Sequence, residues 1–181
     1  RLCASFGFDE VNINVGCPSD TVCGNGYGAC LMKEAGLVQQ LAAAVRANVP
    51  AHVEVTVKHR LGVDDHDSWE ELVAFVEAVS APPARVTRFV VHARTAILGL
   101  STADNRAVPP LRHETVFRLA ERFPQLEFEL NGQVGTLTQA ERCLQECGGV
   151  LRGCMIGRAA FYSPCRLASE TLTLTLTLTP T

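Results

Sequence analysis

Short runs of alternating hydrophobic and polar residues recur along this chain, and each run is followed by a longer amphipathic stretch. In the first run, VNINVGCPSD, the apolar Val11, Ile13 and Val15 alternate with asparagines, which is the period of a β-strand. Pro18 has no backbone N–H with which to continue a strand ladder, so this strand is expected to end before it. The same reasoning predicts strands at 11–15, 53–58, 89–92, 127–131 and 154–156.

Between the predicted strands, apolar residues recur at the spacing of amphipathic helices. Two of these stretches carry a Ser or Thr followed three residues later by Glu, the signature of a capping box at a helix N-terminus. The two pairs are Ser68 with Glu71 and Thr138 with Glu141. Helices are predicted at 31–48, 68–80, 113–123 and 138–146, with a short one near Ala159.

Strands that alternate with helices predict an α/β fold with a parallel sheet, either a closed barrel or a doubly wound sheet. An eight-unit barrel takes about 250 residues, so five units in roughly 165 residues have the spacing of a barrel. We therefore expect a partial TIM (β/α)8 barrel, with five C-terminal βα units in residues 1–168 and a low-complexity Thr/Leu tail in 169–181.

The chain begins with Arg1 rather than Met, which favours a fragment that lacks the first three strands of the barrel. A barrel without these strands is expected to have unpaired strand edges. It is also expected to open apolar side chains of its interior to water.

Composition narrows the function classes. The 181 residues are 47% hydrophobic and 19% charged, which suits one globular domain. The net charge of −3 gives no overall basic surface, so a nucleic-acid partner would need a local patch. No apolar run has the roughly 18 residues of a membrane span, and no signal peptide is evident, so we expect a cytoplasmic protein and leave an organellar location open.

The eight cysteines are expected to be cytosolic thiols rather than a disulfide framework. Their spacings fit no standard zinc pattern, so no metal is expected.

Polar residues follow every predicted strand. Because the carboxyl ends of parallel strands meet at one edge of a sheet, these residues are expected to converge on one cavity, although any one of them alone would ordinarily be a solvated loop residue or a buried thiol. The cations among them suit an anionic ligand, and barrels commonly bind phosphate after their last two strands. The strand-end residues are Asn14, Cys17, Lys58, His59, Arg60, His92, Arg94, Asn131, Gly132, Gly157 and Arg158.

A set of segments in a fixed order carries a family signature: VNINVGCPSD, CGNGYGACLM, VTVKHRLGVDD, FVVHARTAILGLS, DNRAVPPLRHE, FELNGQVGTL and CMIGRAAF. Together they resemble the A-type tRNA-dihydrouridine synthases over about residues 8–164. The resemblance implies a TIM barrel that reduces a uridine in the D-loop of tRNA to dihydrouridine, with FMN as cofactor and NADPH as the reductant.

By motif match, the resemblance also implies roles for individual residues. Cys17 would be the general acid that protonates C5 of the uracil. Asn14 would hold the uracil or the flavin edge. Arg60 and Arg94 would line the mouth where the RNA enters.

The remaining matched residues would bind FMN. Lys58 and His92 would contact its ring and ribityl group. Its phosphate would be held by Asn131, Gly132, Gly157 and Arg158. This sequence has Gln133 where the family has a second glycine, so a side chain is expected close to the phosphate.

Two alternatives stay open. One is another FMN barrel oxidoreductase that acts on a free pyrimidine, similar to dihydroorotate dehydrogenase, although the DNRAVPPL segment argues against it. The other is a truncated, non-catalytic barrel fragment. The oligomeric state and the uridine that is modified are not predicted.

Overall fold

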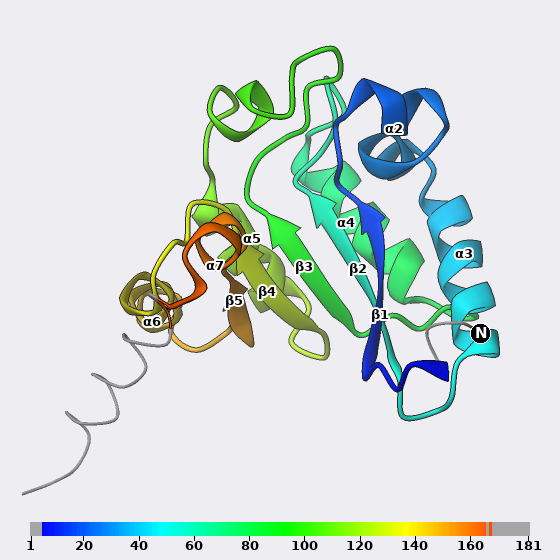
Figure 1. Ribbon diagram of the computed structural model, residues 1–181. Coiled ribbons are helices and arrows are strands. Elements are labelled where there is room, and N and C mark those ends of the chain that lie inside the picture. Colours follow the sequence, from blue (N-terminus) through cyan, green and yellow to red (C-terminus); the bar gives the residue numbers. More distant parts are fainter. Residues whose placement is uncertain (1–4, 166, 168–181) are drawn as a thin grey trace, which may run out of the picture.

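The structure is a computed structural model that describes residues 5–165 and 167, and the predicted tail at 169–181 lies outside this part. It contains a five-stranded sheet in the order β1-β2-β3-β4-β5, shown in Figure 1. All four pairings are parallel. The strands are β1 (Glu10–Val15), β2 (Glu54–Arg60), β3 (Arg88–His92), β4 (Glu127–Asn131) and β5 (Gly153–Met155). The strands lie in the sheet in the same order as in the sequence, as consecutive βα units of a barrel do. This arrangement confirms the predicted α/β class.

Helices connect the strands as predicted, and short helical turns lie in the loops. The α-helices are α2 (Asp20–Gly24), α3 (Ala35–Asn48), α4 (Trp69–Ser80), α5 (His113–Arg122), α6 (Leu137–Glu146) and α7 (Arg158–Tyr162). The 3₁₀ helices are η1 (Gly28–Lys33) and η2 (Asp104–Arg106). The predicted helix at 31–48 is thus a 3₁₀ turn followed by α3. Within the described residues, no helix has the length and apolar character that a membrane crossing requires.

One of the two predicted capping boxes is confirmed and the other is wrong. At α4, Ser68 Oγ accepts from Glu71 N at 3.2 Å, and the Glu71 carboxylate accepts from Ser68 N at 3.2 Å. At α6 the cap is Thr136 rather than Thr138, and its hydroxyl accepts from Gln139 N at 3.1 Å. Gln139 follows Thr136 by three residues, the same spacing as in the predicted pair but two positions earlier.

The hydrophobic core lies between the sheet and helices α3, α4, α5 and α6, which cover one side of the sheet in Figure 1. Alternate strand residues point to this side because side chains alternate along a strand. Each buried aliphatic or aromatic side chain contributes roughly 1.5–3 kcal/mol. The core side chains of the strands include Val15, Val55, Val57, Phe89, Val91, Phe128 and Leu130. Those of α3, α4 and α5 include Val38, Leu72, Phe75, Val76, Val79, Val116 and Leu119.

The other side of the sheet, here called the open face, is mainly polar. The prediction that it would present an apolar barrel interior is therefore wrong. Its side chains are the alternate strand residues. The apolar members are Val90 and Met155, and the polar members are Glu10, Asn12, Asn14, Glu54, Thr56, Lys58, Arg60, Arg88, His92, Glu127, Glu129 and Asn131. The amphipathic strands of this half-barrel bury apolar residues against the helices instead.

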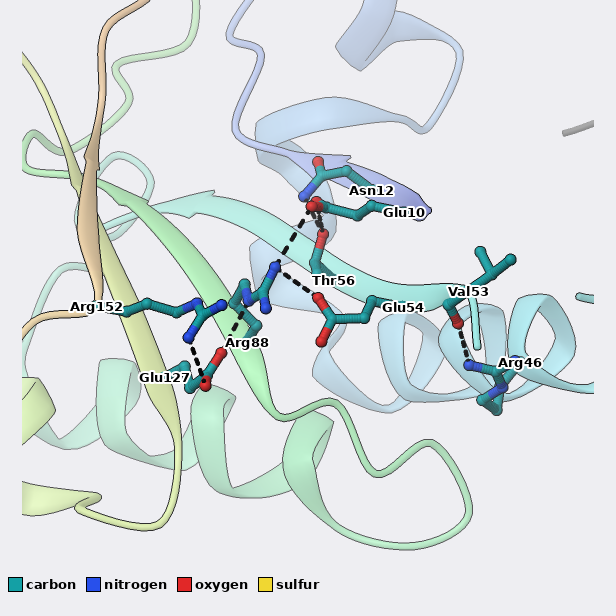
Figure 2. A network of polar contacts seen from close by, with 9 residues as sticks. All are labelled: Glu10, Asn12, Arg46, Val53, Glu54, Thr56, Arg88, Glu127 and Arg152. Atoms are coloured by element: carbon teal, nitrogen blue, oxygen red, sulfur yellow. Dashed lines mark hydrogen bonds and ion pairs between the residues drawn. The ribbon is translucent and has the colours of Figure 1, made fainter. Parts of the chain in front are cut away.

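At the amino-terminal ends of the strands, the open face carries a network of charged side chains (Figure 2). Arg88 lies 2.5 Å from a carboxylate oxygen of Glu54, 2.9 Å from one of Glu127 and 3.7 Å from one of Glu10. Arg152 also contacts Glu127, at 3.1 Å. This network joins the beginnings of all five strands and leaves their carboxyl ends free for a separate site.

Candidate active site

A cavity of about 830 Å³ lies at the carboxyl ends of the strands, on the open face. This volume is within the usual range for small-molecule and cofactor sites. Nine of the ten residues to which the family resemblance assigns a role line it, and Arg94 does not. The nine are Asn14, Cys17, Lys58, Arg60, His92, Asn131, Gly132, Gly157 and Arg158. The structure thus brings these residues together, while the individual roles stay predictions.

Cys17 is held in place by the backbone on either side of it. Asn14 Oδ1 accepts from Gly16 N at 3.0 Å, and Arg60 Nε donates to Gly16 O at 2.9 Å. The Cys17 carbonyl accepts from Ala29 N at 2.8 Å. These bonds fix the turn after β1 and set the Cys17 side chain at the wall of the cavity.

Arg60 lines the cavity, but most of its hydrogen-bonding capacity is directed into the protein. Besides Gly16 O, its guanidinium donates to Thr95 O at 3.2 Å and to Asn105 O at 3.1 Å. The residue is only 3% exposed. Burial, offset in part by the nearby Cys17, lowers the pKa of Arg60 to about 10. Arg60 therefore forms the inner wall of the cavity and joins the loops after β1 and β3, rather than lying at an open mouth as predicted.

Arg94 is the predicted site residue that the structure places elsewhere. It is buried, and its guanidinium donates to the Pro109 carbonyl. The chain turns sharply after β3, where Arg94 N bonds His92 O at 2.7 Å, so the two residues do not share the cavity although they are two positions apart. The prediction that Arg94 lines the mouth is wrong.

The long loop that follows β3 supplies the residues that do line the cavity there, Thr102 and Arg106. The side chain of Asn105 shapes this loop: its Oδ1 accepts from Ile97 N at 2.8 Å, and its Nδ2 donates to Ile97 O at 2.7 Å. Sequence reasoning missed both lining residues because they lie several positions beyond the strand end. The conspicuous DNRAVPPL segment, which contains Arg106, was the signal that could have indicated this loop.

Positive charge dominates the cavity. Lys58, Arg60, Arg106 and Arg158 line it, and no Asp or Glu does so among the residues described. Burial, followed by the charge of Arg60, lowers the pKa of Lys58 to about 8. Burial and the surrounding cations lower the pKa of His92 to about 3, so its imidazole is neutral at neutral pH. Such a cavity favours an anionic ligand.

His59, which follows Lys58 in β2, points to the helix side rather than into the cavity. Its ring packs against Phe75 with a centroid separation of 5.1 Å and against Phe89 at 5.8 Å. Its Nδ1 lies 2.6 Å from Arg60 O, and its buried Nε2 has no partner. Complete burial lowers the pKa of His59 to about 4. Its contribution is therefore to the core.

Glycine backbone and Arg158 form the end of the cavity nearest β4 and β5. Gly132 has φ of 129°, and a Cβ there would lie 3.0 Å from the Leu111 side chain and 3.1 Å from the His92 ring. Gln133 also has a positive φ, 55°, and its side chain is exposed at the cavity. Asn131 Nδ2 donates to Met155 O at 3.1 Å, which ties the two strand ends together.

A comparison with protein-family models matches the model described as "Dihydrouridine synthase (Dus)" to residues 1–180. The chain belongs to the dihydrouridine synthase family. This membership agrees with the predicted resemblance and with a partial TIM barrel.

Curated relatives are similar over nearly the whole chain. The tRNA-dihydrouridine(20/20a) synthase of Synechocystis sp. is 47% identical over 165 residues, which are 91% of this chain and 47% of the relative. That of Pseudomonas syringae pv. tomato is 48% identical over 93% of this chain and 48% of its own length. That of Escherichia coli O6:H1 is 43% identical over 93% of this chain and 49% of its own length. The chain thus spans about half the length of these dihydrouridine synthases.

The charge of the cavity in this dihydrouridine synthase chain suits the phosphate group of a flavin mononucleotide. Four cationic side chains, with no carboxylate among the described lining residues, suit a phosphate group. The close approach of the Leu111 and His92 side chains leaves no room for a Cβ at Gly132. Helix α7 has only five residues, so an anion site here depends on Arg158 and on backbone amides rather than on a helix dipole. For metals, the described residues include no group of three or more His, Cys, Asp or Glu side chains arranged to hold an ion.

Proposed function

We propose that the protein reduces uridine to dihydrouridine in the D-loop of tRNA, with FMN as cofactor and NADPH as reductant. The uridines at positions 20 and 20a, which the names of the relatives specify, are the proposed targets. The observation that carries the proposal is a thiol, Cys17, fixed in the wall of a cavity that four cations line, with no carboxylate among the described lining residues.

In this proposal FMN, when bound, supplies the two electrons that saturate the C5–C6 bond of the uracil. Lys58 and His92 bind its ring and ribityl group, and its phosphate is held by Asn131, Gly132, Gly157 and Arg158. The neutral imidazole of His92 can both donate and accept a hydrogen bond, which suits the polar edge of a flavin.

Cys17 donates a proton to C5 of the uracil, because reduction at C6 leaves negative charge at C5 and on the neighbouring carbonyl. Lys58 lies close enough to Cys17 for their charges to interact. With a pKa near 8 it is mostly protonated at neutral pH, so it can stabilise the developing negative charge on a carbonyl oxygen. Asn14 orients the base, and its bond to Gly16 N keeps Cys17 in place.

The RNA would approach over the loop that carries Thr102 and Arg106, which line the cavity from its outer side. The uridine must leave its stack to reach Cys17, and this is least costly in a single-stranded loop. The overall charge of −3 gives no general attraction for RNA, so local cations such as Arg106 must supply the phosphate contacts.

The test uses the purified protein with tRNA from a strain that lacks dihydrouridine, and counts dihydrouridine by nucleoside mass spectrometry. The wild-type protein should be yellow and should modify positions 20 and 20a. Cys17→Ala should retain flavin but slow product formation by about 10²-fold or more, the usual size of a general-acid contribution. Cys143→Ala, which removes a half-buried thiol outside the cavity, is the matched control. A colourless protein without tRNA turnover would contradict the proposed function, and undiminished turnover by Cys17→Ala would contradict the role of the thiol.

A further inference from the structure

Two more thiols, of Cys23 and Cys30, lie next to Cys17 in the segment that follows β1. Cys23 belongs to α2 and Cys30 to η1, and their thiols lie close enough to interact. Cys30 Sγ also lies 3.0 Å from Tyr27 O and 3.7 Å from Cys23 O. Both thiols are half-buried and free.

The backbone between the two cysteines is built to bring them together. Gly26 and Gly28 have φ values of 79° and 70°, in the left-handed region that glycine adopts without strain. Gly26 N bonds Cys23 O at 2.9 Å, which closes a turn directly after α2. The tight return of the chain through these glycines sets the start of η1 against the end of α2. The proximity of Cys30 Sγ to Cys23 is therefore a consequence of the local fold.

We propose that Cys23 and Cys30 form a reversible disulfide, and that this pair is a modification site for low-molecular-weight disulfides. The thiolate of one cysteine attacks the reagent disulfide, forms a mixed disulfide and releases one equivalent of reagent thiol. The second cysteine then attacks the mixed disulfide, forms the Cys23–Cys30 bond and releases the second equivalent. The protein loses two thiol protons and two electrons, and the reagent disulfide is reduced to two thiols, so the exchange balances.

Oxidation of this pair changes the surroundings of Cys17 directly. The Cys17 carbonyl accepts from Cys23 Sγ at 3.4 Å in addition to Ala29 N at 2.8 Å, and a disulfide has no S–H to donate. A Cβ at Gly28 would lie 2.4 Å from Cys17 O and 3.2 Å from its Cβ, so the segment between the two cysteines packs on Cys17 itself. Formation of the disulfide does not depend on the proposed function, but its position beside Cys17 links thiol oxidation to the candidate active site.

The chain offers an internal comparison. Cys143 of α6 and Cys154 of β5 are also close enough for their thiols to interact. Burial, followed by the neighbouring thiols, raises the pKa of Cys154 to about 12, so very little of it is thiolate at neutral pH. Burial raises the pKa of Cys30 too, but without so large a shift. Because thiolate is the attacking species, the Cys23–Cys30 pair should react first.

The test treats the purified, reduced protein with oxidised glutathione, blocks the remaining thiols with iodoacetamide and maps the peptides by mass spectrometry. Cleavage before Asp20 and after Tyr27 places Cys17, Cys23 and Cys30 on three separate peptides. The wild-type protein should give a Cys23–Cys30 link that reductant reverses, and should give it about tenfold or more faster than any Cys143–Cys154 link.

Single Cys→Ser variants test which cysteines form the link. Cys30→Ser should stop at a mixed disulfide between Cys23 and glutathione, and Cys23→Ser should stop at one on Cys30, whereas Cys143→Ser should give the wild-type link. A wild-type protein that accumulates only mixed disulfides, that links Cys17 to Cys23, or that oxidises Cys143 and Cys154 before this pair would overturn the proposal. The wild-type arm alone decides the outcome if a variant fails to fold.

Discussion

Arg60 Nε donates a hydrogen bond of 2.9 Å to the carbonyl of Gly16, the residue before Cys17. The buried side chain of Arg60, in β2, thus fixes the backbone after β1 that carries Cys17, the candidate general acid. The same guanidinium bonds the carbonyls of Thr95 and Asn105, so one residue joins the loops after β1 and β3.

Replacement of Arg60 should therefore affect both stability and the position of Cys17. Arg60→Met keeps much of the apolar stem but leaves three carbonyl groups without their donor, and each unsatisfied buried acceptor costs about 1–3 kcal/mol. We expect a loss of about 3 kcal/mol in the free energy of unfolding, measured by urea titration. Arg152→Met, which removes an exposed guanidinium paired with Glu127, should cost less than about 1 kcal/mol. Equal losses in the two variants would contradict this assignment.

Substitutions of Lys58 and Arg94 should have different effects, because Lys58 lines the cavity and Arg94 is a buried structural residue. Lys58→Ala removes a charge from the cavity wall, so FMN should dissociate more readily, by about tenfold, as measured by flavin fluorescence on dilution. Arg94→Ala leaves the Pro109 carbonyl without its donor and should lower the melting temperature. Its flavin affinity at a temperature where it stays folded should be within about twofold of the wild type. If folded Arg94→Ala bound flavin more weakly than Lys58→Ala, the assignment of flavin binding to Lys58 and of a structural role to Arg94 would be wrong.

The buried His59 predicts a loss of stability in mild acid. Its pKa is about 4 in the folded protein and near 6.5 in the unfolded chain, so the unfolded chain binds more protons between these values. The free energy of unfolding should therefore fall as the pH drops from 6.5 towards 4, by about 2 kcal/mol between pH 7 and pH 5 from this residue.

The measurement compares wild type with His59→Phe, which keeps a ring between Phe75 and Phe89 but cannot be protonated. The difference in unfolding free energy between the two proteins should shift in favour of the variant as the pH falls. Because other groups titrate alike in both proteins, a difference that is constant with pH would show that His59 is not the cause.

Much of the fold and of the site could be predicted because the strands are short and regular. The alternation in VNINV located β1 and put Asn14 on the face of the cavity, and the predicted span 127–131 matches β4. Prediction failed where the chain leaves the regular period. Arg94 has the sequence spacing of a cavity residue after His92, but the turn there sends it into the protein.

Contacts between loops that are distant in the sequence could not be predicted from the sequence either. Nothing in the local pattern indicates that Arg60 bonds the loop around Asn105, 45 residues away, or that this loop brings Arg106 to the cavity. The apolar periodicity showed that each strand has one apolar side, but it did not show that this side faces the helices. That choice depends on what packs against the sheet, and it explains why the open face is polar.

The charged network on the open face gives the last prediction. Arg88 is 14% exposed in its side chain and contacts carboxylates of Glu10, Glu54 and Glu127. Without it, three partly exposed carboxylates lie close together, and among the described residues only Arg152 remains in an ion pair with one of them, Glu127. Arg88→Leu should therefore lower the free energy of unfolding by about 2 kcal/mol at neutral pH, between the values for an exposed and a buried ion pair.

The pH dependence of this loss identifies its electrostatic origin. Glutamates are protonated in acid, so their mutual repulsion disappears and the cost of Arg88→Leu should shrink by at least about half near pH 3. Arg152→Leu serves as the control, because its guanidinium contacts only Glu127 of the three glutamates and is half-exposed, and its small cost should vary less with pH. Urea titrations of the three proteins at both pH values give the comparison. If the cost of Arg88→Leu were the same in acid as at neutral pH, the contribution of Arg88 would come from the packing of its stem rather than from neutralising the carboxylates at the amino-terminal ends of the strands.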